Sequence, residues 1–170
     1  MISTENASAA PTHWLLVSSP DNFETSRARG FDIAGMKTRH RKKAETVKAG
    51  DTVFFYCVGV KAIAGLAEVT GPYFESDEHI WESRKEGEEY PFRFPIRPLA
   101  VAPTPADYVE VEPFVDALEY VKRWPREHWK LAFQGNVHKL GTHDYELLAA
   151  AVREAAAGAG ATATTMAGVK

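Results

Sequence analysis

Two apolar runs joined by a short glycine-containing connection set the strongest limit on the fold of this chain. Residues 52–58 (TVFFYCV) and 62–70 (AIAGLAEVT) are rich in β-branched and aromatic side chains, and Gly59 and Lys61 lie between them. Such runs favour strands, and a short connection of this kind joins neighbouring strands. Gly50 and Asp51 indicate a turn just before the first run. The sequence therefore predicts a hairpin-like pair of strands with Lys61 at its tip.

Two further segments have the patterns of strands. Residues 14–17 form an apolar run that ends at Ser18, Ser19 and Pro20, which indicates a first strand entering a turn. Residues 91–98 (PFRFPIRP) alternate between apolar and other side chains, as in a half-buried strand. Prolines in that segment cannot donate hydrogen bonds to a neighbouring strand, so we expect an edge strand or a bulged one.

Helices are predicted after the first strand and near the end of the chain. Ser19 can cap a short helix that has Pro20 at its first position and ends at Gly30. The spacing of apolar residues predicts a short helix with Phe114, Leu118 and Val121 and a second that Pro125 opens and that carries Trp129 and Phe133. A last helix is predicted with Thr142 as its cap and with Tyr145, Leu148 and Val152 on one face. Strands in the first hundred residues and helices gathered at the end predict an α+β fold, as a small curled sheet or partly closed barrel.

One domain is expected for 170 residues, of which 45% are hydrophobic. Its predicted limits are residues 13–154, with a disordered N-terminal tail at 1–12 and a flexible Ala/Gly/Thr tail at 155–170. Cys57 is the single cysteine, which favours a reducing compartment. No apolar run approaches the roughly 18 residues of a membrane span, and the N-terminus lacks the pattern of a secretory signal. We therefore expect a soluble, cytoplasmic protein.

Catalytic and metal-binding patterns are weak. The six histidines lack the spacing of a metal site, and no glycine-rich phosphate loop is present, so no metal or cofactor is predicted. Cys57 lies inside an apolar strand, where a thiol is usually an inert core group with a raised pKa. Ser18 and Ser19 lack the glycines of a nucleophile elbow. Lys61 and Glu68 are the best remaining candidates for general acid and base, although a surface lysine with a rim glutamate is the favoured explanation of the two residues.

Basic and aromatic residues together offer a different kind of site. The net charge is −3, so a nucleic-acid partner would need a local basic patch, and residues 37–43 (KTRHRKK) supply five lysines and arginines and a histidine. Trp14, Phe31, Tyr56, Trp81 and Phe133 lie at strand ends or beside loops. Aromatic faces can stack on a flipped base while cations hold its phosphates. A solvated basic loop above a core of aromatics remains the alternative.

Several stretches, in order over residues 13–150, resemble the EVE domain, also known as the UPF0310 group, within the PUA-like superfamily. They are HWLLVSSPDNF, Gly35 and His40 ahead of VKAGDTVFFY, then IAGLAEVTGPYF, EEYPFRFPIRPL and FVDALEYVKRWPREHWKLAFQGNVHKLGTHDYELL. The resemblance implies a pseudo-barrel of about five or six strands flanked by helices. It also implies recognition of a modified base in nucleic acid, because the related YTH and SRA-type domains hold a methylated base in an aromatic cage.

The resemblance also suggests where the pocket lies. The stretch GLAEVTGPYFESDEHIW is similar to a YTH segment that precedes a cage tryptophan, which here is Trp81. Residues 18–22 and the loop around Gly35 would line the same pocket. The predicted base pocket thus comprises Trp14, Ser18, Ser19, Asn22, Phe31, Gly35, Tyr56, Trp81, Phe133 and Gln134. Predicted phosphate contacts come from Lys37, Arg39, His40, Arg41 and Lys42.

The sequence departs from the family at one pocket position. Many members carry a tryptophan immediately before the loop glycine, and this chain has Ala34 there, with Phe31 as the nearest aromatic. Either Phe31 takes the place of that ring, or the cage is incomplete and the ligand differs from the methylated base that the family suggests.

Three functions are consistent with the sequence. The first is a non-catalytic module that binds DNA or RNA carrying a modified base, such as a methylated cytosine or adenine. The second is a small amidohydrolase acting on modified nucleosides, as the resemblance to ASCH-type relatives implies, with Lys61 and Glu68 as its catalytic pair. The third is a protein-interaction module whose pocket is vestigial.

Overall fold

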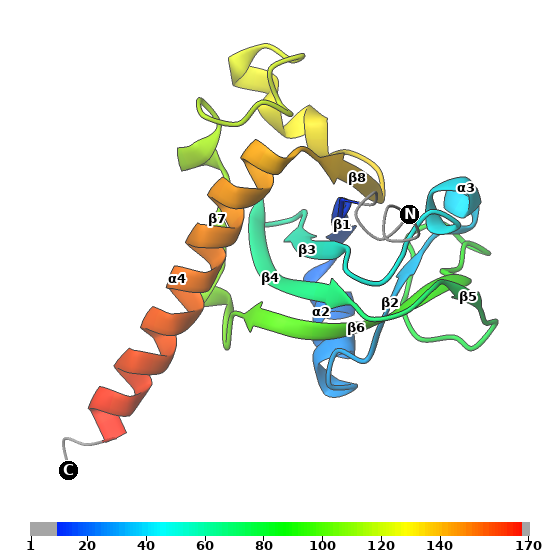
Figure 1. Cartoon of the computed structure of the whole chain (residues 1–170), viewed down its shortest axis with the longest axis horizontal. Helices are drawn as coiled ribbons and strands as arrows, with labels where there is room; N and C mark the ends of the chain where they lie inside the picture. Colours follow the sequence, from blue (N-terminus) through cyan, green and yellow to red (C-terminus); the bar gives the residue numbers. More distant parts are fainter. Residues whose placement is uncertain (1–9, 168–170) are drawn as a thin grey trace, which may run out of the picture.

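The computed structural model of the chain describes residues 10–167 and the side chains of residues 10–159, and it is built around one curled, mixed sheet (Figure 1). The main path through the sheet runs β2-β6-β4-β3-β1-β8, while β5 pairs with β6 and β7 pairs with β4. The strands are β1 (His13–Ser18), β2 (Ile33–Met36), β3 (Thr52–Cys57), β4 (Ala62–Val69), β5 (Phe74–Glu75), β6 (Phe92–Val101), β7 (Val109–Glu110) and β8 (Val137–Leu140). The predicted α+β class with a curled sheet is confirmed.

The predicted hairpin is the centre of this sheet. Strands β3 and β4 are antiparallel, with Val53 opposite Ala67, and Lys61 lies in the turn with a positive φ of 54°. The register shifts between Phe55 and Tyr56, which is a bulge that increases local twist. Strand β1 lies parallel to β3, so the end of β1 at Ser18 lies beside Cys57 at the end of β3.

The proline-rich strand β6 is an interior strand, so the predicted edge position is wrong, while the predicted bulge is present. It lies between β2 and β4, and its register against β4 shifts between Leu66 and Ala67, where Pro98 pairs with Ala67. A bulge tolerates proline because the ladder is already interrupted there. Arg93, which alternation places on the outer face, is buried under the loop after β5 and donates to Tyr90 O and Ser76 Oγ, both at 3.0 Å.

The first helix begins as predicted. Helix α2 (Pro20–Ala28) has Ser19 as its N-cap, whose Oγ accepts a hydrogen bond from the backbone N–H of Asn22. The chain leaves α2 through Gly30, with a φ of 73°. The other helices are α3 (Arg41–Ala44), α4 (Thr142–Ala167) and the 3-10 turns η1 (Thr38–His40), η2 (Pro105–Asp107), η3 (Glu112–Phe114) and η4 (Arg126–Phe133).

One predicted helix is not formed. Residues 114–121 form only the end of η3 followed by turns, because the backbone N–H groups of Glu119 and Tyr120 donate to the Asp144 carboxylate instead of to the preceding turn. Helix α4 extends through residues 155–167, which belong to the tail predicted at 155–170, and alanine, the strongest helix former, is frequent there. Residues 1–9 and 168–170 lie outside the described part, and so does most of the predicted N-terminal tail.

The sheet separates two apolar clusters, because successive side chains of a strand point to opposite faces. Leu16, Phe55 and Phe94 pack with Phe23 of α2 on one face. Leu15, Phe54 and Leu66 pack on the other face with α4 and residues 111–133, and Figure 1 shows α4 crossing that side of the sheet. Among the helices of residues 10–167, none is long and apolar enough to cross a membrane.

Candidate functional site

A small pocket lies where the end of β1, the start of α2, strand β2 and the loop after β5 meet. This inner pocket is lined by Leu16, Val17, Ser18, Asn22, Ser26, Ala34, Gly35, Phe55, Trp81, Tyr90 and Asn136. Its volume is about 30 Å³, little more than a water molecule requires. It shares five residues (Val17, Ser18, Asn22, Tyr90 and Asn136) with an outer groove of about 550 Å³, so the two form one continuous depression.

Trp81 forms the back wall of the inner pocket. Its indole N–H donates to Ser26 Oγ at 2.9 Å, and Tyr90 meets it edge-on, with ring centroids 5.8 Å apart at an interplanar angle of 72°. Gly35 lies directly against the indole, because a Cβ at residue 35 would lie 2.7 Å from Cζ3 of Trp81. The guanidinium carbon of Arg93 lies 5.3 Å from the centre of the Trp81 ring. The ring is therefore fixed from several sides.

Two buried asparagines hold the walls of the pocket together. Asn22 donates to the backbone oxygen of Glu82 at 2.7 Å and accepts from its N–H at 3.0 Å, which fastens the loop that carries Trp81 to α2. Asn136 accepts from the N–H of Lys37 at 3.0 Å and accepts through its backbone oxygen from the N–H of Val17 at 2.9 Å. Asn136 thereby joins β1, the segment before η1 and the start of β8.

The outer groove carries both signs of charge. Lys37, Arg39 and Arg84 line it together with Asp21 and Glu82. Glu88, on the same loop as Trp81, lies 3.0 Å from Lys37 Nζ and 3.0 Å from Arg39 Nη1, and Ser83 donates to it at 2.6 Å. The Ser83 hydrogen bond and the two cations lower the pKa of Glu88, so it is ionised at neutral pH. The Glu88 carboxylate is thus already paired with Lys37 and Arg39, two of the cations that line the outer groove.

The other predicted phosphate contacts lie farther from the pocket. Arg41 forms an ion pair with Glu75 at 3.0 Å, and its guanidinium covers the Phe92 ring. Lys42 is exposed and lines neither the inner pocket nor the outer groove. Burial, with help from Lys43 and Arg39, lowers the pKa of His40 to about 4. His40 is therefore neutral at pH 7 and adds no positive charge to the predicted phosphate contacts.

Three of the predicted pocket aromatics belong to the core instead. Phe31 packs against Phe23 with ring centroids 5.3 Å apart, so it does not replace the ring that Ala34 lacks. The indole N–H of Trp14 donates to the buried Asp51 at 2.9 Å. Tyr56 lies on the other face of the sheet with its ring 5.0 Å from that of Phe133. Each is a strand or turn residue whose side chain points into an apolar cluster.

The remaining predicted residues do come together. Ser18, Asn22, Gly35 and Trp81 line the inner pocket, and Ser19, Phe133 and Gln134 line the outer groove. Sequence reasoning missed Tyr90 and Asn136, which complete the inner pocket. The signal for Tyr90 was an aromatic residue directly before the proline-rich strand. The sequence signal for Asn136 was weaker: it is an amide residue directly after Gly135, within the stretch that resembles the family.

The proposed catalytic pair does not form a site. Lys61 lies at the tip of the β3–β4 turn and Glu68 near the opposite end of β4, about 23 Å along the strand at 3.3 Å per residue. Glu68 is paired with Arg97 of β6. Cys57 is fully buried, and burial raises its pKa to about 11, as expected for an inert core thiol. The amidohydrolase that depended on Lys61 and Glu68 therefore has no support in the structure.

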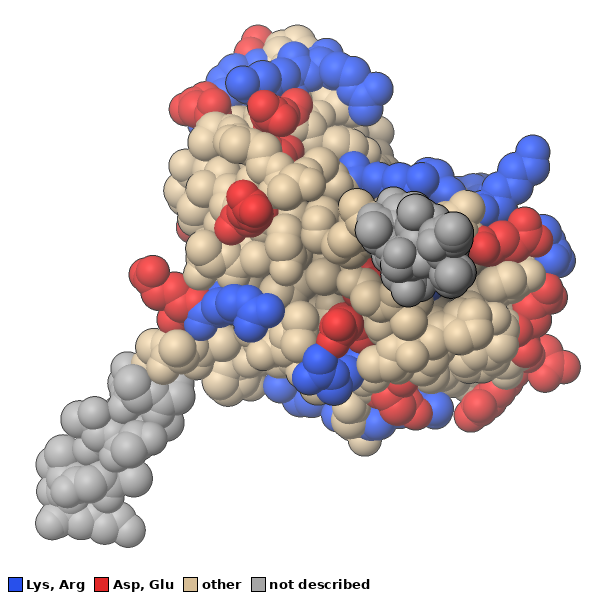
Figure 2. Space-filling view, in the orientation of Figure 1, with Lys and Arg blue, Asp and Glu red and all other residues tan. Residues whose placement is uncertain are grey.

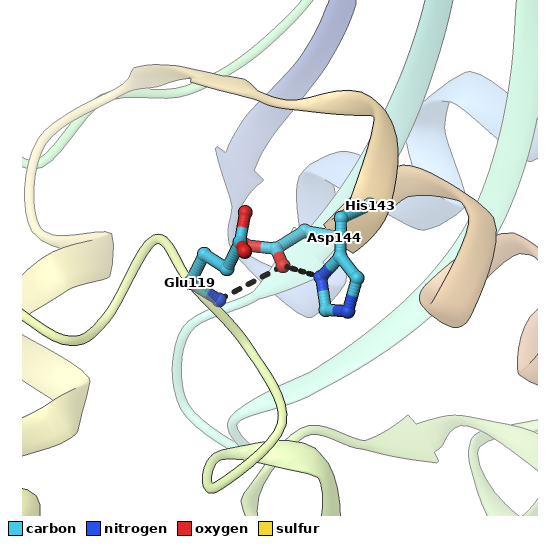
Figure 3. A group of neighbouring side chains, drawn as sticks. All are labelled: Glu119, His143 and Asp144. Carbon is cyan, nitrogen blue, oxygen red and sulfur yellow. Dashed lines mark hydrogen bonds and ion pairs between the residues drawn. The ribbon is translucent and has the colours of Figure 1, made fainter.

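One cluster of metal-ligating residue types lies outside the pocket, at the start of α4 (Figure 3). The buried Asp144 accepts from the N–H groups of Glu119 at 2.9 Å and Tyr120 at 2.8 Å, and His143 Nδ1 lies 2.9 Å from Asp144 Oδ1. The hydrogen bond to Asp144 raises the pKa of His143. Both carboxylate oxygens already accept backbone donors, so this group is a structural link between α4 and residues 111–125.

Comparison with known proteins assigns the chain to a family. The EVE domain matches residues 12–149. The chain belongs to the EVE domain family. Among curated proteins, a UPF0310 protein of Pyrococcus abyssi is 25% identical over 146 residues, which cover 81% of this chain and 96% of that relative. The predicted membership of the EVE and UPF0310 group is thus confirmed.

Solved structures of low sequence identity share the fold. An Agrobacterium tumefaciens protein matches with a TM-score of 0.52 and 20% identity, over 85% of this EVE chain and 92% of its own. The Mmi1 YTH domain matches with a TM-score of 0.61 and 10% identity, over 85% of this chain and 76% of the Mmi1 chain. A structure of the Mmi1 YTH domain in complex with RNA gives a TM-score of 0.58 and 9% identity, over 85% of this chain and 79% of the Mmi1 chain. These matches show that the curled α+β fold of the chain is shared with EVE-like and YTH domain structures.

Proposed function

We propose that this EVE domain is a non-catalytic module that binds single-stranded nucleic acid and takes one modified base into the inner pocket beside Trp81. The observation that carries the proposal is the pocket itself, which has an aromatic back wall and opens into a groove with Lys37, Arg39 and Arg84 on its sides. Aromatic surfaces bind bases of any sequence, while cations bind the backbone.

The shape of the pocket indicates how a base would be admitted. The inner part holds about 30 Å³ in this state, so a base needs the Tyr90 side chain to move outward. Tyr90 is half-buried, and its hydroxyl makes one long contact of 3.5 Å with Glu82 O. The back wall, in contrast, is held by Ser26, Gly35 and Arg93. A movable front and a fixed back suit a pocket that closes over its ligand.

The shared fold supports the same class of partner. The Mmi1 YTH domain, which has a similar fold, has been crystallised with RNA. Its identity to this chain is 9%, so the support concerns the kind of scaffold and not individual contacts. The choice between a modified cytosine and a modified adenine, and between DNA and RNA, is a question for the binding experiment.

Fluorescence anisotropy with matched short strands tests the proposal. The strands carry unmodified, 5-methylcytosine, 5-hydroxymethylcytosine or N6-methyladenine bases, each in DNA and in RNA, at two salt concentrations. We expect at least a tenfold preference for one modified strand, which corresponds to about 1.4 kcal/mol. Binding that ignores every modification at both salt concentrations would contradict the base-binding role and leave only an electrostatic surface.

A further inference from the structure

A second groove adjoins the outer groove and is positively charged. We propose that this groove, between α3 and β8, is the binding site for the phosphates that follow the captured base, with Lys43 and Lys139 as its cationic contacts. We call it the α3–β8 groove; its lining includes Arg39, His40, Lys43, Gln134, His138 and Lys139. The proposal rests on the proposed function, because it assumes a nucleic-acid strand at the inner pocket.

The charges of the α3–β8 groove distinguish it from the outer groove. Arg39, Lys43 and Lys139 line it, and no carboxylate does, although the chain as a whole has a net charge of −3. Within residues 10–159, neither Lys43 nor Lys139 forms an ion pair, whereas Lys37, Arg39 and Arg41 are all paired with Glu88 or Glu75. Unneutralised cations attract a polyanion more strongly than paired ones, so this groove is the better phosphate site.

Figure 2 agrees with this distribution. Lys and Arg side chains form a band between the positions at which Figure 1 labels β8 and α3, while Asp and Glu side chains gather along the neighbouring edge of the molecule, on the side of β5. The Nζ of Lys139 lies 5.2 Å from the centre of the Trp14 ring, which holds its stem against the surface of the sheet.

Two imidazoles line the groove beside the lysines. Within residues 10–159, Nε2 of His40 and Nε2 of His138 are buried without a hydrogen-bond partner, while His138 Nδ1 is bonded to the Tyr120 hydroxyl at 2.7 Å. Burial lowers the pKa of both imidazoles, so they are neutral at pH 7. The positive charge of the groove therefore comes from Arg39, Lys43 and Lys139.

The groove lies where a strand leaving the pocket would run. It has a volume of about 470 Å³ and shares Arg39, Gln134, Gly135 and Asn136 with the outer groove. Asn136 also lines the inner pocket, so the three depressions are continuous around one residue. A base held beside Trp81 therefore leaves its neighbouring phosphates at Arg39 and then at Lys43 and Lys139.

Single lysine substitutions test this path, with Lys42→Ala as the matched control. Lys42 lies next to Lys43 on α3, is also exposed and lines neither groove. Affinity of each full-length variant for the preferred strand and its unmodified counterpart is measured between 50 and 300 mM salt. Lys43→Ala and Lys139→Ala should each lower the slope of log K against log salt by about 0.7 and weaken binding of both strands about fivefold at 0.1 M salt. Lys139→Arg should restore binding.

The possible outcomes separate this proposal from the proposed function. If the wild type prefers one modified strand but Lys43→Ala and Lys139→Ala behave like Lys42→Ala, the phosphate path is wrong and the pocket stands. If both variants lose affinity as expected while no modification is preferred, the groove binds phosphates and the base pocket is wrong. If no strand binds the wild type at any salt concentration, both proposals are overturned.

Discussion

Gly35 lies against Trp81 so closely that a Cβ at residue 35 would be 2.7 Å from Cζ3 of the indole. Non-bonded carbons approach to about 3.5–4.0 Å, so any other residue at this position displaces the ring or the strand that carries it. The glycine is required here by the ring and not by the backbone, because its φ is not positive. One aromatic wall of the pocket thus depends on the absence of a side chain on the neighbouring strand.

The first prediction concerns this contact. Gly35→Ala should lower the free energy of unfolding by about 1–3 kcal/mol, as expected for an overpacked site, and should reduce the preference for the modified strand. Gly59→Ala is the control, because a Cβ at Gly59 meets no atom within 4 Å. Urea unfolding and the ratio of the two strand affinities are the measurements. Equal behaviour of the two variants would show that the contact has no consequence for the pocket.

The second prediction concerns Glu88 as a competitor of phosphate. Glu88→Gln removes the charge that is shared by Lys37 and Arg39, so the affinity for modified and unmodified strands should rise about fivefold at 0.1 M salt. Glu86→Gln, two residues away on the same loop, removes the same charge without those ion pairs. A decrease in affinity for Glu88→Gln would instead mean that the carboxylate positions the two cations for binding.

The third prediction concerns the link between α4 and the segment before η4. Asp144→Asn leaves one oxygen where two backbone N–H groups require acceptors, which should lower the free energy of unfolding by about 1–3 kcal/mol. The matching fall in Tm is about 2–4 °C per kcal/mol for a chain of this size. Asp116→Asn, at an exposed ion pair with Arg126, should change Tm little.

Added Zn²⁺ or EDTA should leave the Tm of the wild type unchanged if the cluster of Glu119, His143 and Asp144 is purely structural.

The fourth prediction concerns pH and His40. Its pKa is about 4 in the folded protein and about 6.5 when unfolded, so between these values the unfolded chain binds more protons. The contribution of His40 to stability is thus fully present above pH 6.5 and is lost as the pH falls toward 4. His40→Gln should reduce the slope of the unfolding free energy against pH in this window, by at most the amount that corresponds to one bound proton. An unchanged slope would contradict the assigned burial of the imidazole.

Local sequence signals were sufficient for the elements that depend on neighbouring residues. The β3–β4 hairpin, the Ser19 cap and the start of α4 at Thr142 each follow from residues a few positions apart. The family resemblance supplied the position of Trp81 and of the residues after β1. Local patterns also indicated correctly that Cys57 is a buried thiol.

Contacts between distant segments could not be read from the sequence. Asn136 joins Val17 and Lys37, which are 119 and 99 positions away, and no local pattern indicates such a link. The pairing of Lys37 and Arg39 with Glu88 likewise depends on how the loop after β5 folds back over β2. In the basic stretch, Lys37, Arg39 and Arg41 are thus paired with carboxylates, whereas Lys42 and Lys43 form no ion pair within residues 10–159.

The affinity of the wild type and Trp81→Ala for one matched pair of modified and unmodified strands tests the central claim most directly. Trp124→Ala, a half-buried tryptophan outside the pocket, is the control, and cooperative thermal unfolding confirms that each variant is folded. We predict that Trp81→Ala loses the preference for the modified strand while it keeps most of its affinity for the unmodified one, and that Trp124→Ala retains the preference. A preference that survives in Trp81→Ala would contradict a base pocket at Trp81.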